Sequence, residues 1–204
     1  VKGAYNGLFS DPTNGVTLET AGSFNINVTK SGLVIGKIVL GKAYPFIGRF
    51  NASGYADISV NCGRGKTPLA LTLQLDLQNG SDEVVGTVSG EGWSSTLRGD
   101  LAKAKPEFLS SRYTMAISGN TNAAIAPGGS GFGTVHFDAA GGAHFKGALA
   151  DGTKFNQRIP VSKNGLVPFY LPLYNGSGSL LSWLQLTSNS VSGDAIWIKK
   201  AASK

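Results

Sequence analysis

The sequence predicts an all-β protein in which antiparallel meander strands form a duplicated β-barrel or barrel-like sandwich, built from two tandem repeats. Three observations predict this class. Apolar and polar residues alternate along several stretches, turn-forming clusters separate those stretches at intervals of about 8 to 12 residues, and patterns of the first half recur in the second. The composition of 29 Gly, 41% apolar and 15% charged residues among 204 is typical of a folded chain and not of a disordered one.

Period-two alternation is clearest in two stretches. In residues 24–29, Phe, Ile and Val alternate with Asn and Thr, and in residues 69–78 every second residue is Leu. This alternation predicts strands with one face on a core and the other in water. The segment 100–109 has some helical character, but Pro106 interrupts it, so we interpret it as a connector.

Clusters rich in Gly, Asn, Asp and Ser predict tight turns between the strands. We interpret the excess of glycine mainly as the corners of this meander. The clusters occupy residues 11–15, 30–32, 51–54, 79–82, 139–142, 163–165 and 175–178.

The connector separates two copies of one pattern. The matched places are 73–75 with 184–186 (LQL), 88–90 with 191–193 (VSG), Trp93 with Trp197, Gly36 with Gly147, Gly41 with Gly152 and Tyr5 with Tyr113. We therefore predict β repeat 1 in residues 1–105 and β repeat 2 in residues 106–204. Each copy has enough strands to close a small barrel, or the two pack as one unit and share a larger one. The two matched tryptophans are expected to cap the core of each copy.

Several short motifs carry a resemblance. They are residues 3–9 (GAYNGLF, with the pattern G-x-Y-x-G-L-F), 88–93 (VSGEGW), 127–135 (PGGSGFGTV), 149–153 (LADGT) and 197–199 (WIK). They resemble a duplicated glycine-rich β module at the C-terminal end of large secreted or surface proteins of environmental bacteria, and the similarity spans essentially the whole chain. The resemblance implies an extracellular or cell-surface setting and a modular role in adhesion or ligand binding. It implies no catalytic residues.

Four classes of function are disfavoured by the residues themselves. Residues 63–67 (GRGKT) end like a phosphate-binding loop, but Val60 stands where that motif needs Gly, and a strand is predicted to follow in place of a helix. The net charge of +6 comes from scattered Lys and Arg, so no specific nucleic-acid partner is expected. No apolar run is long enough to span a membrane. Cys62 is alone, which excludes an internal disulfide and a thiolate-based metal site.

The two histidines permit a metal-binding hypothesis. A simple hairpin register places His136 opposite His144, with Asp138 as a third candidate ligand. Two imidazoles do not complete a tetrahedral shell, and cross-strand histidine pairs are ordinary on a wet sheet face, so we expect no metal and no cofactor. Paired carboxylates for glycoside hydrolysis remain an alternative among the 12 Asp and Glu. Because no site for nucleophilic catalysis can be assembled, we expect no enzyme activity and name no catalytic residue.

The aromatic residues of the hairpin around Gly176 give the candidate ligand site. A two-residue turn at Gly176 and Ser177 predicts Tyr170 opposite Trp183, with Tyr174 and Gln185 on the same face. Aromatic rings beside an amide suit a sugar, because the C–H groups of the sugar stack on the rings and the amide forms hydrogen bonds with its hydroxyls. The alternative is burial of this hairpin on both sides between the two copies, since residues 167–173 make its other face apolar too.

These observations predict a non-catalytic extracellular binding or adhesion module with a polysaccharide or cell-surface glycan as the preferred ligand. The expected ligand-binding residues are Tyr170, Tyr174, Trp183 and Gln185. The alternative is a purely structural terminal or spacer domain of a large surface protein, and a further alternative is a carboxylate-dependent glycoside hydrolase. We expect a monomer that is part of a longer chain.

Overall fold

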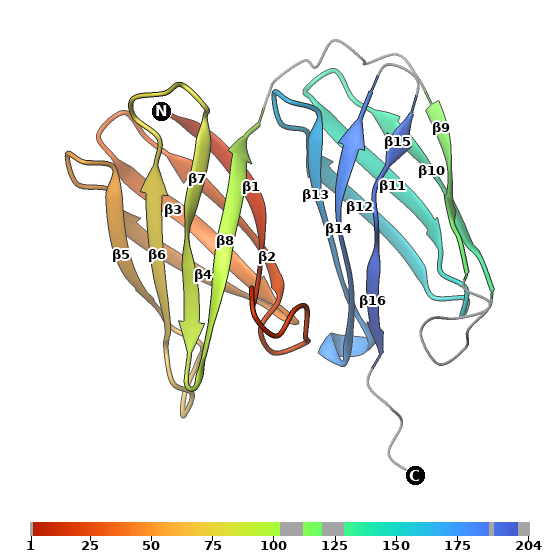
Figure 1. Cartoon of the computed structure of the whole chain (residues 1–204), viewed down its shortest axis with the longest axis horizontal. Coiled ribbons are helices and arrows are strands. Elements are labelled where there is room, and N and C mark those ends of the chain that lie inside the picture. The colour runs from red at the N-terminus through yellow and green to blue at the C-terminus, as the bar shows by residue number, and fades with distance from the viewer. Residues whose placement is uncertain (1, 103–111, 120–128, 188–189, 200–204) are drawn as a thin grey trace.

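The computed structural model describes residues 2–102, 112–119, 129–187 and 190–199, and most of them lie in β-strands or in the turns between them (Figure 1). The paired strands are antiparallel, and no α-helix occurs in these described ranges. The predicted all-β antiparallel class is therefore confirmed. The boundary that we predict between residues 105 and 106 lies outside the described residues.

Eight strands of the first half form one sheet in the order β4-β3-β2-β1-β8-β7-β6-β5. Neighbours in this order are also neighbours in sequence, except that β1 pairs with β8 and so joins the two ends of this half. The two edge strands β4 and β5 contact each other, and the sheet is therefore a nearly closed, barrel-like one around a core that includes Phe9, Ile26 and Leu71. The strands are β1 (Gly3–Ser10), β2 (Gly22–Val28), β3 (Leu33–Leu40), β4 (Lys42–Arg49), β5 (Tyr55–Val60), β6 (Leu69–Leu75), β7 (Glu83–Gly90) and β8 (Trp93–Leu101).

The second half consists of two sheets around a core of its own. One has the order β12-β11-β10-β9, and in the other β14 pairs with β13 on one side and with β15 and β16 on the other. The core between them includes Phe145, Phe169 and Leu180. The elements are β9 (Arg112–Ile117), β10 (Gly131–Phe137), β11 (Gly142–Ala148), β12 (Lys154–Pro160), β13 (Leu166–Leu173), a 3₁₀ turn (Tyr174–Gly176), β14 (Gly178–Leu186), β15 (Val191–Ser192) and β16 (Ile196–Lys199).

The duplicated barrel is not confirmed. In the first half β8 closes the sheet by pairing with both β7 and β1, whereas within the described residues β9 pairs only with β10. The repeat itself stays a prediction. Figure 1 shows the two halves side by side, each with its own strands.

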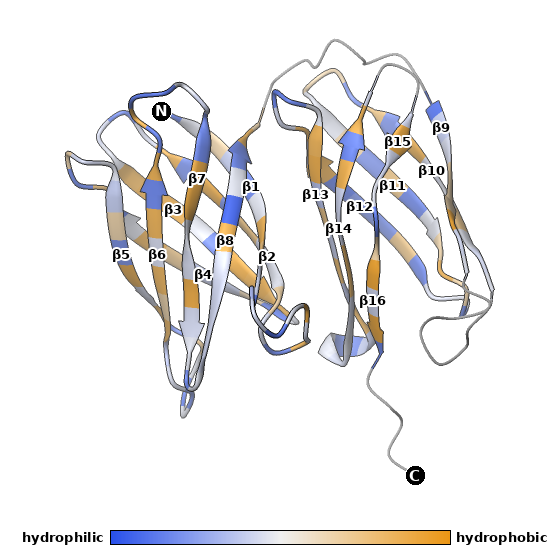
Figure 2. Cartoon of the chain, in the orientation of Figure 1, coloured by the Kyte–Doolittle hydropathy of each residue, from blue (hydrophilic) through white to orange (hydrophobic). Residues whose placement is uncertain are grey.

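The alternation that predicts the strands determines which side chains enter the cores. In β6, Leu71 and Leu73 are fully buried while Thr72 and Gln74 point outward, and Figure 2 shows hydrophobic and hydrophilic bands alternating along such strands. Residues 63–67 form a turn that leads into β6 and not into a helix, as expected. Turns occur at all of the predicted clusters, with glycines in the left-handed region at Gly15, Gly32, Gly54, Gly80, Gly141, Gly165 and Gly176.

The interpretation of glycines as mainly corners is incomplete. Gly36 and Gly86 lie inside strands, where each side chain would point into the core. A Cβ at Gly36 would lie 2.4 Å from the carbonyl oxygen of Asn25, and one at Gly86 would lie 1.9 Å from that of Thr72. These glycines let neighbouring backbones approach closely where the sheet curls.

The two halves pack against each other through the outer faces of β1 and of the β13–β14 hairpin. The buried residues of this interface cluster are Leu8, Ala21, Tyr170 and Leu181, with Val16, Val39 and Trp183 half-buried around them. Polar contacts also join the two halves. The Gly41 amide donates to the Tyr170 hydroxyl oxygen at 3.2 Å, and Lys163 Nζ lies 2.7 Å from Asp82 Oδ2.

Candidate functional site

The hairpin that carries the predicted ligand site has a different turn from the expected one. Its last pair is Leu173 with Gly178, so residues 174–177 form a four-residue loop in which Tyr174 and Asn175 both have positive φ. The predicted register is therefore wrong: Tyr170 lies opposite Leu181, and Trp183 lies opposite Pro168. The faces are unaffected, because the shift is by two residues and side chains alternate with a period of two.

The structure does not gather the four predicted residues on one open surface. Tyr170 is only 2% exposed, and Trp183 packs beside it in the interface cluster. Tyr174 points elsewhere, since its hydroxyl donates to Asp151 and Lys199 Nζ lies 4.8 Å from the centre of its ring. Gln185 is exposed, and its Nε2 donates to the carbonyl oxygens of Asn164 and Leu186, both at 3.0 Å, but the buried Tyr170 and the half-buried Trp183 do not share an open surface with it.

Burial on both sides, the alternative for this hairpin, describes it better. Phe169 and Leu171 lie in the core of the second half, while Tyr170 and Leu181 face the first half. Burial raises the pKa of Tyr170, as expected for a phenol removed from water. This face of the hairpin therefore holds the two halves together.

The histidine pair forms as predicted. His136 lies opposite His144, and the two rings stack with their centres 4.6 Å apart. Asp138 is already engaged: Arg158 Nε lies 2.6 Å from its Oδ2, and His144 Nε2 lies 2.8 Å from the same atom. The Arg158 guanidinium holds the pKa of Asp138 well below its usual range. Asp138 also accepts hydrogen bonds from the amides of Ala140 and Gly142 and so orders the turn between β10 and β11. We therefore do not propose it as a metal ligand.

Two further carboxylates order turns by similar means. The Ser81 hydroxyl, followed by the amides of Asn79, Ser81 and Gln78, lowers the pKa of Asp76. Burial acts to raise the pKa of Asp151, but hydrogen bonds from the Tyr174 hydroxyl and the Lys199 ammonium outweigh it and lower that pKa.

Acid is expected to destabilise the protein as the pH falls below about 4, the ordinary pKa of Asp. Asp76, Asp138 and Asp151 have lower pKa values in the folded state, so each stabilises the fold above the unfolded-state pKa, and this contribution is lost on protonation. The midpoint of thermal unfolding, measured from about pH 6 to about pH 2, should decrease below about pH 4.

Two asparagine variants give matched controls of opposite sign. Asp138→Asn removes one of the lowered pKa values and should make the acid loss shallower. Burial raises the pKa of Asp100, which is 3% exposed, so its protonation stabilises the fold as the pH falls toward about 4. Asp100→Asn should remove this gain and so enlarge the total loss between about pH 6 and about pH 2. Identical pH profiles for Asp138→Asn and the parent chain would contradict this assignment.

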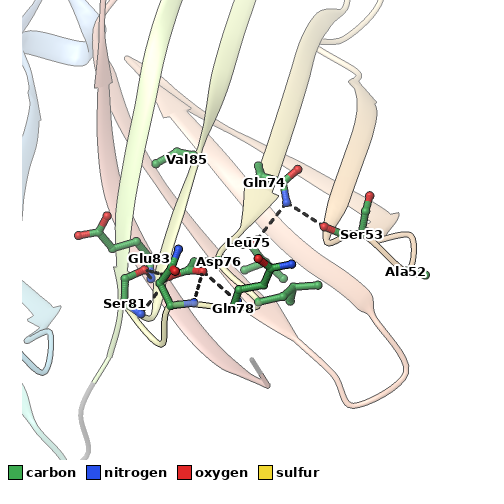
Figure 3. Close-up of a pocket in the computed structure, with 11 residues that line it drawn as sticks. Ala52, Ser53, Gln74, Leu75, Asp76, Gln78, Ser81, Glu83 and Val85 are labelled. Carbon is green, nitrogen blue, oxygen red and sulfur yellow. Dashed lines mark hydrogen bonds between the residues drawn. The ribbon is translucent and has the colours of Figure 1, made fainter.

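A polar depression lies at the end of the β6–β7 hairpin in the first half. It has a volume of about 630 Å³ and includes Ser53, Gln74, Gln78 and Ser81 in its lining. Figure 3 shows Gln74 and Ser53 on one side of it and Ser81 and Glu83 on the other. Its size is in the range of small-molecule sites.

Apolar groups lie beside these polar ones. Leu77 and Val85, which line the depression, are each 44% exposed, and Tyr55 is 39% exposed. Register places Tyr55, Gln74 and Val85 side by side on adjacent strands, with Arg98 next in the row. An aromatic ring, an amide and an aliphatic group therefore share the outward face of β5, β6 and β7. Gln74 and Val85 line the depression, and Tyr55 lies next to Gln74 in the row, outside that lining.

The polar groups of the depression are arranged for hydrogen bonding. Gln74 donates from Nε2 to the carbonyl oxygens of Ser53 and Leu75, which orients its amide. Asp76 Oδ2 accepts a hydrogen bond from the Ser81 amide in the turn, and Glu83 Oε1 lies 2.8 Å from Arg98 Nη2. A glycosidic general acid needs a raised pKa, whereas that of Asp76 is lowered, so Asp76 does not suit that role.

Sequence reasoning missed this depression. It treated the outward residues of β6 as a solvated polar face, although one signal was present: Tyr55 occupies an outward position in a strand whose inward positions are Ala56, Ile58 and Val60. An exposed aromatic next to an amide on the neighbouring strand is informative only when the register is known, and the sequence does not supply it.

Comparison of the chain with protein-family models, with curated proteins and with solved structures finds no match. Two general features of the described part of the chain complete the description. No helix in it is long and apolar enough to cross a membrane, and it contains no cluster of three or more His, Cys, Asp or Glu that could hold a metal ion.

Proposed function

We propose that this chain is a non-catalytic binding module of an extracellular or cell-surface protein and that its ligand is a glycan. The observation that supports the proposal is the depression at the end of the β6–β7 hairpin, where Gln74, Gln78 and Ser81 lie beside the exposed side chains of Leu77 and Val85. The site differs from the one expected from the sequence, because Tyr170 and Trp183 belong to the interface between the halves.

Binding would combine stacking with hydrogen bonds. The C–H face of a sugar would rest on Tyr55 and Val85, which flank Gln74 in the cross-strand row. Because the Gln74 amide nitrogen is bonded to two backbone carbonyls, its Oε1 is oriented and can accept a bond from a sugar hydroxyl. No bond is made or broken in this mechanism.

Loss of retention on polysaccharides is the expected result for Tyr55→Ala and for Gln74→Ala. Each change removes one contact, and we expect roughly tenfold weaker binding, equivalent to about 1.4 kcal/mol. The measurement is affinity electrophoresis against a panel of soluble polysaccharides, followed by titration of any that retards the protein.

Ile47→Ala is the matched control, since Ile47 is 64% exposed on β4, outside the depression. It should bind like the parent chain. The proposal fails if no polysaccharide retards the parent protein, or if Ile47→Ala weakens binding as much as Tyr55→Ala does.

A structural terminal or spacer domain is the second candidate function. The observation that favours it is the interface cluster, in which the aromatic hairpin predicted to bind ligand instead joins the two halves. A panel without a single binder, together with cooperative unfolding of both halves, would support this function over the first.

A further inference from the structure

Within its described residues, the second half has one strand position fewer than the first. In the first half β8 lies between β7 and β1 and pairs with both. In the second half β15 and β16 run along β14 in succession, and β9 is the edge of the other sheet. Within the described residues, no strand lies between β9 and the β15–β16 edge.

A groove occupies this position, with a volume of about 500 Å³. Met115 and Ile117 line it from β9, and Val191 and Gly193 line it from β15 and the residues after it. Phe169, which belongs to the core of the second half, also lines the groove. The groove therefore opens the core between two sheet edges, and such edges present unpaired backbone groups that can accept a further strand.

Ser182 provides an independent sign that something binds here. It lies in β14 with its side chain toward the core, it lines the groove, and it is only 2% exposed. Its hydroxyl has no hydrogen-bond partner in the described part of the chain. Buried hydroxyls normally have a partner, because an unpaired one has lost its bonds to water without replacement.

We propose that this groove is a strand-acceptor site, which binds an extended segment of a partner protein by adding it between β9 and the β15–β16 edge. The partner's backbone would pair with the two edges, and its alternate side chains would enter the core. This mode of binding takes affinity from main-chain hydrogen bonds and specificity from the pockets for alternate side chains.

We infer the chemistry of the partner from β8, which lies between β7 and β1 as the added segment would lie between the β15–β16 edge and β9. The residues of β8 that point inward include Ser95, Leu97 and Gly99, all buried. We therefore infer a segment with small or aliphatic residues at alternate positions and a polar group able to reach the Ser182 hydroxyl. A second copy of this chain is a poorer occupant, since it would have to release β8 from both of its ladders.

The direct test uses a synthetic peptide with the sequence of β8, residues 93–101, added to the full chain. Hydrogen exchange measured with and without the peptide should show slower exchange of the backbone amides of β9 and of β15–β16, and a scrambled peptide of the same composition should have no effect. Absence of slowing in these strands at peptide concentrations up to about 1 mM would overturn the proposal.

Ser182→Leu tests the groove itself, because the larger side chain would occupy the space of the incoming strand. We expect roughly tenfold to hundredfold weaker peptide binding, corresponding to the usual cost of overpacking. Ser59→Leu, on an exposed position of β5, is the matched control and should bind normally.

If Ser182→Leu does not fold, the exchange pattern of the parent chain still decides. Two results would contradict the partner-protein assignment. One is peptide binding that protects amides elsewhere and not at β9. The other is a concentration-dependent dimer of the chain alone that protects the same edges, which would assign the groove to a second copy.

Discussion

Tyr170→Ala is expected to destabilise the protein by about 3–5 kcal/mol, the usual cost of truncating a buried aromatic side chain. Tyr170 is 2% exposed and packs in the interface cluster with Leu8 and Leu181, so the truncation leaves a cavity between the two halves. The change also removes the acceptor of the Gly41 amide. Urea unfolding of the purified chain, followed by far-UV circular dichroism, would measure the loss.

We also expect the truncation to change the number of steps in the unfolding curve. Because the truncation weakens the contact between halves that have separate cores, Tyr170→Ala should unfold in two steps if the parent chain unfolds in one. Tyr170→Phe is the matched control, since it keeps the ring and loses only the hydroxyl, at a cost of about 0.5–1.5 kcal/mol. Equal stability of Tyr170→Ala and the parent chain would mean that this hairpin face is open to solvent, as the sugar platform requires.

Gly86→Ala is expected to destabilise the first half by at least about 3 kcal/mol. An added Cβ would lie 1.9 Å from the Thr72 carbonyl oxygen and 2.8 Å from its carbonyl carbon, both backbone atoms. Relief of this clash would require β7 to move away from β6. That movement would break part of the hydrogen-bonded ladder that β7 forms with residues 70–75 of β6. Chemical unfolding and yield of folded protein would both report it.

Gly92→Asn is the control for this prediction. Gly92 lies in the β7–β8 turn with a φ of 76°, and an added Cβ there meets no atom within 4 Å. Because Asn tolerates the left-handed region, the control should cost much less than Gly86→Ala. Comparable losses in both variants would show that backbone freedom, and not close approach of two strands, is what glycine provides in β7.

Much of the fold follows from local pattern. The strand over residues 69–75 was predictable from its leucines, and the turns from their glycines and asparagines, because alternation and turn chemistry act within a few residues. The pairing of His136 with His144 was predictable for the same reason, since a short turn between them sets the register. A register set by an unusual loop was not: a positive φ is common for Asn, as at Asn175, but no residue pattern signals the positive φ of Tyr174.

The candidate site shows the same division. Tyr55, Gln74 and Val85 are far apart in the chain, and only the pairing of β5, β6 and β7 places them in one row. The exposure of the predicted aromatic residues also depends on a distant surface, because β1 covers Tyr170 through Leu8.

The amino-acid sequence by itself therefore determined the all-β class, the positions of the turns, and the strands over residues 24–28 and 69–75 together with the apolar face of each of these two. These properties depend on residues close together in the chain, where backbone geometry has a fixed period. Only the tertiary structure decided how the sheets close, which apolar face is buried between the halves and which polar face stays open. Those outcomes depend on which strands become neighbours. In this chain the decisive contacts are those of β1 with β8 and of β1 with β13, and in both cases the two strands lie far apart in the sequence.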